Sequence, residues 1–220
     1  MDIVKTVQKM RLEKTAQALR ANNMDAFVVD SRNDAKKIVE DLLFEGAVIA
    51  NGGTVTAQEC GLFELFESDK YEFLDRTKAQ DVTEIYRKSF FADFYFTSAN
   101  AITENGELYN VDGNSNRVAA IAYGPKNVIV VAGVNKIVKN LDDAQKRVKM
   151  IASPANTIRL GIESSCAKTG ECVALKNDAD CEMTQGCSAD TRICCNYLIS
   201  ARQRIKGRIK VILINESLGF

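Results

Sequence analysis

The chain has 220 residues, 46% of them hydrophobic and 26% charged, which is the composition of one ordinary globular domain with a substantial core. Its formal net charge is zero, so it offers no basic field to hold nucleic acid or an anionic membrane surface. It contains no histidine, which excludes every Ser–His or Cys–His pair and leaves proton transfer to Glu, Asp, Lys, Tyr or Cys.

The first expected element is a helix over residues 2–22, with a partial apolar stripe among Lys, Arg and Glu residues. No apolar core follows the charged start, so this segment does not have the pattern of a signal peptide. No run in the chain approaches the roughly 18 apolar residues of a membrane span. We therefore expect a cytoplasmic protein that makes no membrane contact and whose seven cysteines start as thiols.

Expected strands and helices alternate from residue 25 to residue 153. The expected strands are 25–29, 47–50, 71–74, 93–96, 107–111, 127–133 and 210–214. The expected helices after the first are 32–44, 56–67, 78–91, 115–123 and 141–152, and residues 153–165 are expected to be irregular. The alternation predicts a three-layer, doubly wound α/β fold with a mainly parallel sheet, to which 210–214 returns.

The segment Asn51-Gly-Gly-Thr-Val-Thr56 joins the second expected strand to the next helix. Glycines at such a junction let backbone N–H groups approach a ligand. The segment is neither a GxGxxG motif nor a P-loop, and a tight turn explains it as well as a ligand loop does. As a ligand loop, it would cradle an anion with Gly52, Gly53 and Thr54.

Residues 94–117 gather small and polar side chains around an expected hairpin turn at Asn105-Gly106. Strand ends that deliver hydroxyls, amides and a carboxylate next to a helix start are typical ligand sites of α/β proteins, although an ordinary turn-rich hairpin is the alternative. Glu104 is the expected acid–base group, because histidine is absent and partial burial in the hairpin would raise the pKa of its carboxyl group.

Five further residues are expected to hold a small anionic ligand. Amide and hydroxyl groups would orient it, and one of two cations would pair with its charge. The alternative for the charged residues is an ordinary solvated side chain. The five are Ser98, Asn100, Asn116, Arg117 and Lys136.

Six of the seven cysteines lie between residues 166 and 195, in a polar, loop-rich segment that buries little apolar surface. In a reducing compartment, clustered thiols point to zinc or an iron–sulfur cluster. The segment has no C-x-x-C and no ferredoxin spacing. Redox-active or disulfide-forming cysteines, and inert cysteines, therefore stay open as alternatives.

Several long motifs resemble the LUD (lactate-utilisation) domain family. They are Asn51-Gly-Gly-Thr-Val-Thr-Ala-Gln-Glu-Cys-Gly-Leu62, Thr97-Ser-Ala-Asn-Ala-Ile-Thr-Glu-Asn-Gly-Glu-Leu108, Asp112-Gly-Asn-Ser-Asn-Arg-Val-Ala-Ala120, Gly124-Pro-Lys-Asn-Val-Ile-Val-Val-Ala-Gly-Val-Asn-Lys-Ile-Val138 and Val211-Ile-Leu-Ile-Asn-Glu-Ser-Leu-Gly-Phe220. The resemblance implies a fold related to the sugar-phosphate isomerase and CoA-transferase group. Relatives in this family belong to an iron–sulfur system that oxidises L-lactate to pyruvate.

The cysteine segment is similar to the tail of the short members of this family. The matching pieces are Cys166-Ala-Lys-Thr-Gly-Glu-Cys172 and Cys187-Ser-Ala-Asp-Thr-Arg-Ile-Cys194. The resemblance nominates Cys166, Cys172, Cys187 and Cys194 as a four-thiol set for an iron–sulfur cluster or zinc. Ser165 replaces the usual proline, residues 173–186 look like an insertion, and Cys181 and Cys195 are additional.

Two functions follow for a single LUD-like domain, residues 1–220, that carries the cysteine-rich insertion 166–195 before its last strand. The first is a component of a cytoplasmic L-lactate or organic-acid oxidation system that binds an anionic small molecule in an α/β pocket. The alternative is a non-catalytic metal- or iron–sulfur-binding redox or assembly subunit that docks on an iron–sulfur oxidoreductase. A homodimer is left open.

Overall fold

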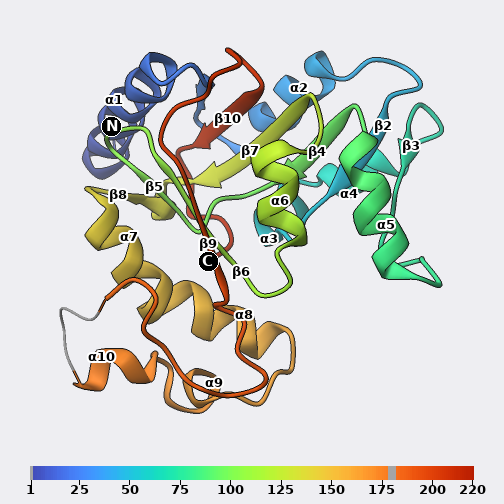
Figure 1. Cartoon of the computed structure of the whole chain (residues 1–220). Helices are drawn as coiled ribbons and strands as arrows, with labels where there is room; N and C mark the ends of the chain where they lie inside the picture. The colour runs from blue at the N-terminus through green and yellow to red at the C-terminus, as the bar shows by residue number, and fades with distance from the viewer. Residues whose placement is uncertain (1, 178–181) are drawn as a thin grey trace.

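Six parallel strands form the main sheet of the computed structural model, which describes residues 2–177 and 182–220 (Figure 1). Across the sheet, the strands are ordered β1 (Asp25–Val29), β10 (Ile209–Ile214), β7 (Asn127–Gly133), β4 (Phe94–Thr97), β2 (Val48–Asn51) and β3 (Glu72–Phe73). The last strand, β10, pairs in parallel with both β1 and β7, so it returns to the interior of the sheet as expected. The doubly wound, mainly parallel α/β fold is confirmed.

Both faces of this sheet are covered, because the side chains of its central strands alternate between two apolar clusters. Along β7, Val128 and Val130 belong to a cluster that includes residues of the first helix, α1 (Ile3–Ala21). Ile129 and Val131 belong to the cluster on the opposite face. The long apolar run 127–133 was therefore a reliable signal for a central strand.

Ten α-helices surround the sheets in the described part of the chain. After α1 these are α2 (Arg32–Leu42), α3 (Val55–Glu59), α4 (Leu62–Phe66), α5 (Val82–Lys88), α6 (Asn116–Tyr123), α7 (Leu141–Arg147), α8 (Ser153–Arg159), α9 (Ser165–Thr169) and α10 (Val173–Asn177). Short 3-10 turns lie at Ser89–Phe91 and Val134–Lys136. None of the described helices is long and apolar enough to span a membrane.

Two helix expectations were wrong. The helix expected over 56–67 is divided by Gly61, whose φ of 66° is left-handed and ends α3 before α4 begins. Residues 153–165 are not all irregular, because α7 continues through a π-helical turn, Val148–Ala152, into α8. Pro154 is tolerated in the first turn of α8, where the preceding π turn has already interrupted the regular hydrogen-bond ladder.

A second, four-stranded sheet has the order β8 (Ile137–Val138), β5 (Ala101–Thr103), β6 (Leu108–Asp112) and β9 (Asn196–Ser200). Its antiparallel pair β5–β6 contains the expected turn, with Gly106 at φ 79°. Gly106 also lies against the backbone of α1, where an added Cβ would come within 2.6 Å of Leu19 N. The hairpin starts at β5, not at the strand expected over 93–96, which is β4 of the main sheet.

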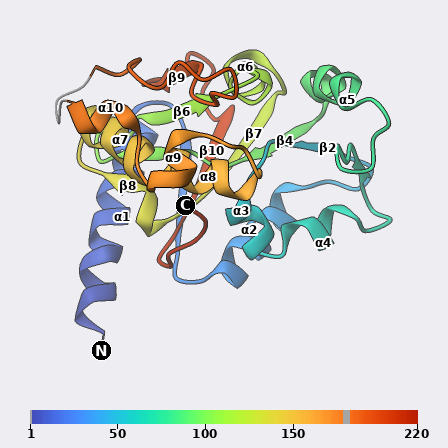
Figure 2. The ribbon, with the colours of Figure 1, turned by 90° about the horizontal axis from the view of Figure 1, so that it is seen from below.

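The segment from α7 to α10 and the cysteine-rich loops lie together at one end of the molecule, next to the second sheet (Figures 1 and 2). Helix α7 packs on β5 and β8, and α8 packs on α9. Strand β9 follows the cysteines and pairs antiparallel with β6. The second sheet thus connects the cysteine segment to the end of the main sheet where β2, β4 and β7 terminate.

Candidate anion-binding cavity

A cavity of about 590 Å³ lies at the carboxyl ends of β2, β4 and β7, facing α6 and α8. Parallel strands bring these ends to one edge of the sheet, which is the usual ligand position in an open α/β sheet. The structure brings seven of the eight expected ligand-binding residues to its walls: Gly53, Thr54, Ser98, Asn100, Asn116, Arg117 and Lys136. Their binding of a ligand stays a prediction.

The eighth residue, Gly52, has a different position. It does not line the cavity, but an added Cβ would come within 2.9 Å of the Cδ atom of Arg117 and 3.0 Å of the Tyr95 hydroxyl oxygen. Glycine is therefore required here because the Arg117 side chain passes directly over the backbone.

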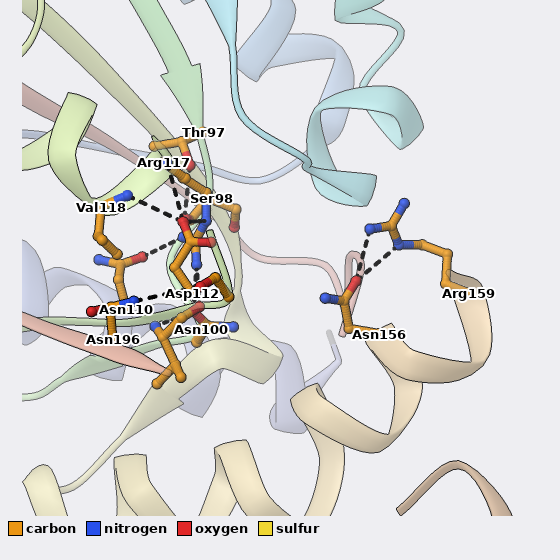
Figure 3. Close-up of polar contacts among 12 residues, drawn as sticks. Thr97, Ser98, Asn100, Asn110, Asp112, Arg117, Val118, Asn156, Arg159 and Asn196 are labelled. Carbon is orange, nitrogen blue, oxygen red and sulfur yellow. Dashed lines mark hydrogen bonds and ion pairs between the residues drawn. The ribbon is translucent and has the colours of Figure 1, made fainter. Parts of the chain in front are cut away.

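Arg117 belongs to the first turn of α6, and its side chain, which is 12% exposed, packs against the β5–β6 hairpin in one wall of the cavity, the hairpin wall (Figure 3). Its guanidinium Nε lies 3.7 Å from a carboxylate oxygen of Asp112. Burial lowers the pKa of Arg117, and the Asp112 carboxylate opposes this effect. The guanidinium group donates hydrogen bonds to the carbonyl oxygens of Ser98 and Val111 and to the side-chain oxygens of Asn100 and Asn110.

Asp112 holds the start of α6 in place. One of its carboxylate oxygens accepts the backbone N–H groups of Arg117, at 3.1 Å, and Val118, at 3.2 Å (Figure 3). These N–H groups belong to the first turn of the helix and have no acceptor within it. The Asp112 carboxylate is thus committed to α6 and Arg117 and is not free to neutralise other cations of the cavity.

Lys136 ends the 3-10 turn after β7 and is only 4% exposed. Its Nζ atom donates a hydrogen bond to the Ser98 hydroxyl oxygen at 3.0 Å. Burial, followed by the positive charges of Arg147 and Arg117, lowers the pKa of Lys136 to about 7, while Glu59 acts in the opposite direction. The residue expected to be either a solvated lysine or a charge partner is therefore a buried amine.

Two cavity arginines, Arg76 and Arg159, were missed in the sequence. An added Cβ on Gly53 would lie 3.1 Å from Nη2 of Arg76 and 3.7 Å from Nη2 of Arg159, so both guanidinium groups reach the same point above the loop. Arg159 donates two hydrogen bonds to the side-chain oxygen of Asn156 (Figure 3). Within residues 2–177 and 182–220, neither arginine forms an ion pair.

Positive charge predominates in the lining of the cavity. Partial burial and the nearby positive charge of Arg76 both lower the pKa of Arg159. Arg192, a third missed arginine, is held by the carbonyl oxygens of Thr184, Cys187 and Cys194. The cationic lining residues are Arg76, Arg117, Lys136, Arg159 and Arg192, and the acidic ones are Asp112 and Asp190.

Glu104 does not lie with these residues. It follows β5 and is absent from the lining of the cavity, and its carboxylate forms ion pairs with Arg11 and, at 3.1 Å, Lys14 of α1. Hydrogen bonds from Arg11 and Lys14 lower the pKa of Glu104, so the expectation of a raised pKa was wrong. Its assignment as the catalytic group remains an untested prediction, which its position outside the cavity does not support.

The four nominated thiols, Cys166, Cys172, Cys187 and Cys194, line a second, smaller cavity of about 30 Å³. Burial raises the pKa of the Cys194 thiol, and the nearby thiols of Cys172 and Cys166 also raise it. Hydroxyl groups contact two of the sulfur atoms, with Ser153 Oγ at 2.9 Å from Cys194 Sγ and Ser164 Oγ at 3.2 Å from Cys166 Sγ.

These thiols do not form a ready coordination sphere. In the part of the chain that the structure describes, no group of three or more His, Cys, Asp or Glu side chains is arranged to hold a metal ion. Of the two additional cysteines, Cys195 is exposed, and Cys181 lies outside the described residues. Cys60 is a buried core residue, and burial raises the pKa of its thiol to about 11.

Comparison with known proteins agrees with the resemblance in the motifs. The family model of the LUD domain matches residues 12–214. Among solved structures, a DUF162 family protein from Deinococcus radiodurans has a TM-score of 0.52 at 13% identity, covering 94% of this chain and 98% of that one. The eIF2B beta structure from Chaetomium thermophilum gives a TM-score of 0.37 at 16% identity, covering 53% and 42%. No curated protein matches the sequence.

Proposed function

The chain belongs to the LUD-domain family, and from this premise we propose that it binds an anionic small molecule in the cationic cavity, as a component of an L-lactate or other organic-acid oxidation system. The family supplies the metabolic context, and the cavity supplies the chemistry. A carboxylate or phosphate is the group that its lining would recognise, because guanidinium groups match the geometry of both.

The observation that carries this proposal is the convergence of Arg76 and Arg159 above Gly53. Like charges at short range repel each other, and neither arginine forms an ion pair with a carboxylate of the described residues. An anion that accepts hydrogen bonds from both guanidinium groups would replace this repulsion with attraction. The arrangement is therefore better explained by an external anion than by the needs of the fold.

Polar side chains near this point would orient the rest of the ligand. The Asn116 side chain lines the cavity and forms no hydrogen bond within residues 2–177 and 182–220. The Ser98 hydroxyl lies on the same wall as Lys136. Lining of this kind, with a few polar groups and fixed cations, is typical of sites for small charged molecules.

Isothermal titration calorimetry tests the proposal with L-lactate, pyruvate and inorganic phosphate as probes. We expect at least one to bind and Arg76→Gln or Arg159→Gln to weaken its binding by about tenfold or more, since a charged hydrogen bond contributes about 1.5–3 kcal/mol. Arg87→Gln is the matched control, because Arg87 is exposed on α5 and forms no ion pair within the described residues. Absence of binding by all three probes, or equal binding by all variants, would contradict the proposal.

The alternative function, a metal- or iron–sulfur-binding redox or assembly subunit, has one observation in its favour. The four nominated cysteines come from separate parts of the segment and line one small cavity. As arranged, they do not fit a metal ion, so binding would require their side chains to move. In this function, the partner would be an iron–sulfur oxidoreductase.

Metal analysis of protein purified without air tests this alternative. Iron or zinc that is bound to the parent protein, lost in Cys166→Ser and retained in Cys195→Ser would support it. Cys195 is a suitable control because it is exposed and does not line the small cavity. Metal-free protein would rule the alternative out and leave the cationic cavity as the functional site.

A further inference from the structure

We infer that Lys136 is a nucleophile that forms an imine with a small aldehyde or ketone that carries a carboxylate or phosphate group. The inference rests on the proposed anion site, since the cations of the cavity would hold the acidic end of such a molecule. It adds a reacting residue and a substrate class, namely a compound with a carbonyl group close to an anionic group.

The side chain of Lys136 is almost fully buried, yet it lines the cavity. Within the described residues it forms no ion pair, and its hydrogen bond goes to the neutral Ser98 hydroxyl. A buried lysine without a carboxylate partner is costly for the fold when it is charged, and such lysines occur where a neutral amine is used.

Two nearby arginines act on the pKa of Lys136 in the same direction as burial. Arg147 and Arg117 both disfavour its protonated form. Glu59 favours it, but one of its carboxylate oxygens accepts the Gly219 backbone N–H at 2.7 Å. With the pKa of Lys136 lowered to about 7, a large fraction of the amine is neutral at physiological pH. Desolvation and a neighbouring cation are the means by which enzymes activate a lysine nucleophile.

The reaction needs no oxidant or reductant. The Nζ lone pair attacks the carbonyl carbon and forms a C–N bond, while the carbonyl π electrons move to oxygen, which takes up a proton. The resulting carbinolamine loses its hydroxyl group and the nitrogen proton as water, which leaves a C=N bond. The Ser98 hydroxyl, 3.0 Å from Nζ, is placed to pass a proton between nitrogen and oxygen.

The remaining cations of the cavity explain why a neutral carbonyl compound would be a poor substrate. Arg76 and Arg159 line the same cavity as Lys136 and have no acidic partner among the described residues. They would hold a carboxylate or phosphate and so bring the carbonyl group to the amine. Positioning of this kind converts a slow bimolecular attack into a rapid one within the complex.

Reductive trapping tests the inference. The full chain is incubated with pyruvate, glyceraldehyde 3-phosphate or the neutral control acetone, reduced with sodium borohydride and mapped by peptide mass spectrometry. We expect an adduct on Lys136 with pyruvate, with glyceraldehyde 3-phosphate or with both. An adduct with only one of them would assign the substrate to the carboxylate or the phosphate class. The yield should be lower by about tenfold or more with acetone, since attack then lacks positioning.

Lys136→Met and Lys136→Arg should both lose the adduct, and the second keeps a positive charge in case the first alters the fold. Lys139→Met is the matched control, because Lys139 is an exposed lysine three residues away. Anion binding by calorimetry without an adduct on Lys136 would overturn the imine and leave the proposed function standing. Equal labelling of exposed lysines would also overturn it, whereas failure of both binding and trapping would remove the proposed function as well.

Discussion

Two walls of the same cavity surround their arginines differently: the hairpin wall, where Arg117 packs against β5–β6, and the Gly53 wall, where Arg76 and Arg159 reach over Gly53. On the hairpin wall, Arg117 is nearly buried and every part of its guanidinium group has an acceptor or an acidic neighbour (Figure 3). On the Gly53 wall, Arg76 and Arg159 lie close together, and neither forms an ion pair with a carboxylate of the described residues. The charge of Arg117 therefore serves the fold, and the charge of the other two is available for a ligand.

The largest effect is expected for Arg117→Gln. Its removal would leave buried carbonyl and amide oxygens without a donor and the Asp112 carboxylate without its cation. Breaking a buried, hydrogen-bonded charge cluster typically costs about 3–5 kcal/mol. Urea denaturation at neutral pH should show this loss in the free energy of unfolding. If Arg117→Gln lowered the free energy of unfolding by less than about 1 kcal/mol, which is the range of an exposed ion pair, the difference proposed between the two walls would be wrong.

Lys136→Met should stabilise the protein by a few kcal/mol in acid, because it removes a buried amine that folding keeps from its preferred protonated form. The pKa of Lys136 is lowered to about 7 from its ordinary 10.5, so the unfolded chain binds more protons between these values. The wild-type protein is thus penalised fully below pH 7, and the penalty disappears as the pH rises toward 10.5.

Unfolding curves from pH 6 to pH 10 would measure this difference, with Lys139→Met as the exposed control. If the difference in the free energy of unfolding between variant and wild type grew with pH, it would contradict the buried position of Lys136. A constant difference would show that its amine keeps an ordinary pKa.

Arg76→Gln should change the free energy of unfolding by no more than about 0.5 kcal/mol, the usual range for a surface substitution away from special features. It removes no ion pair within the described residues. Denaturation of the same preparation that is used for calorimetry would measure this. If Arg76→Gln lost as much stability as Arg117→Gln, the arginines of both walls would be needed to stabilise the fold.

A similarly small loss of stability is expected for Glu104→Gln, which removes partly exposed ion pairs to α1 that contribute about 1 kcal/mol or less. Since Arg11 and Lys14 lower the pKa of Glu104, this contribution is present at neutral pH and is lost as the pH falls through the lowered pKa. Ligand binding should not change, because Glu104 does not line the cavity. A loss of ligand affinity in calorimetry would restore Glu104 as a site residue.

The fold was predictable where periodicity and turn residues acted locally. The apolar run 127–133 and the Asn105-Gly106 turn specify a central strand and a hairpin with little help from the rest of the chain. The junction at Pro154 was misread because a π turn, which depends on tertiary packing, removes the usual penalty for proline. Strand β9 was not expected because it follows the polar, loop-rich cysteine segment.

The candidate site was predictable only in part. Ser98 and Lys136 follow the parallel strands β4 and β7, so the topology of the main sheet brings them together, whereas Arg117 follows the antiparallel strand β6. Arg76 and Arg159 come from a loop after the edge strand and from a segment that was expected to be irregular. The raised pKa expected for Glu104 was wrong because its ion pairs join it to α1, ninety or more residues away along the chain. Such long-range electrostatic contacts leave no local pattern in a sequence.

Anomalous diffraction from crystals that contain selenate, a phosphate-like dianion, tests the central claim most directly. We expect a selenium peak in the cavity, with selenate oxygens at hydrogen-bond distance from the guanidinium groups of both Arg76 and Arg159, and no such peak in the double Arg76→Gln, Arg159→Gln variant. A cavity without the peak in wild-type crystals, or the same peak in the double variant, would contradict an anion site at the Gly53 wall.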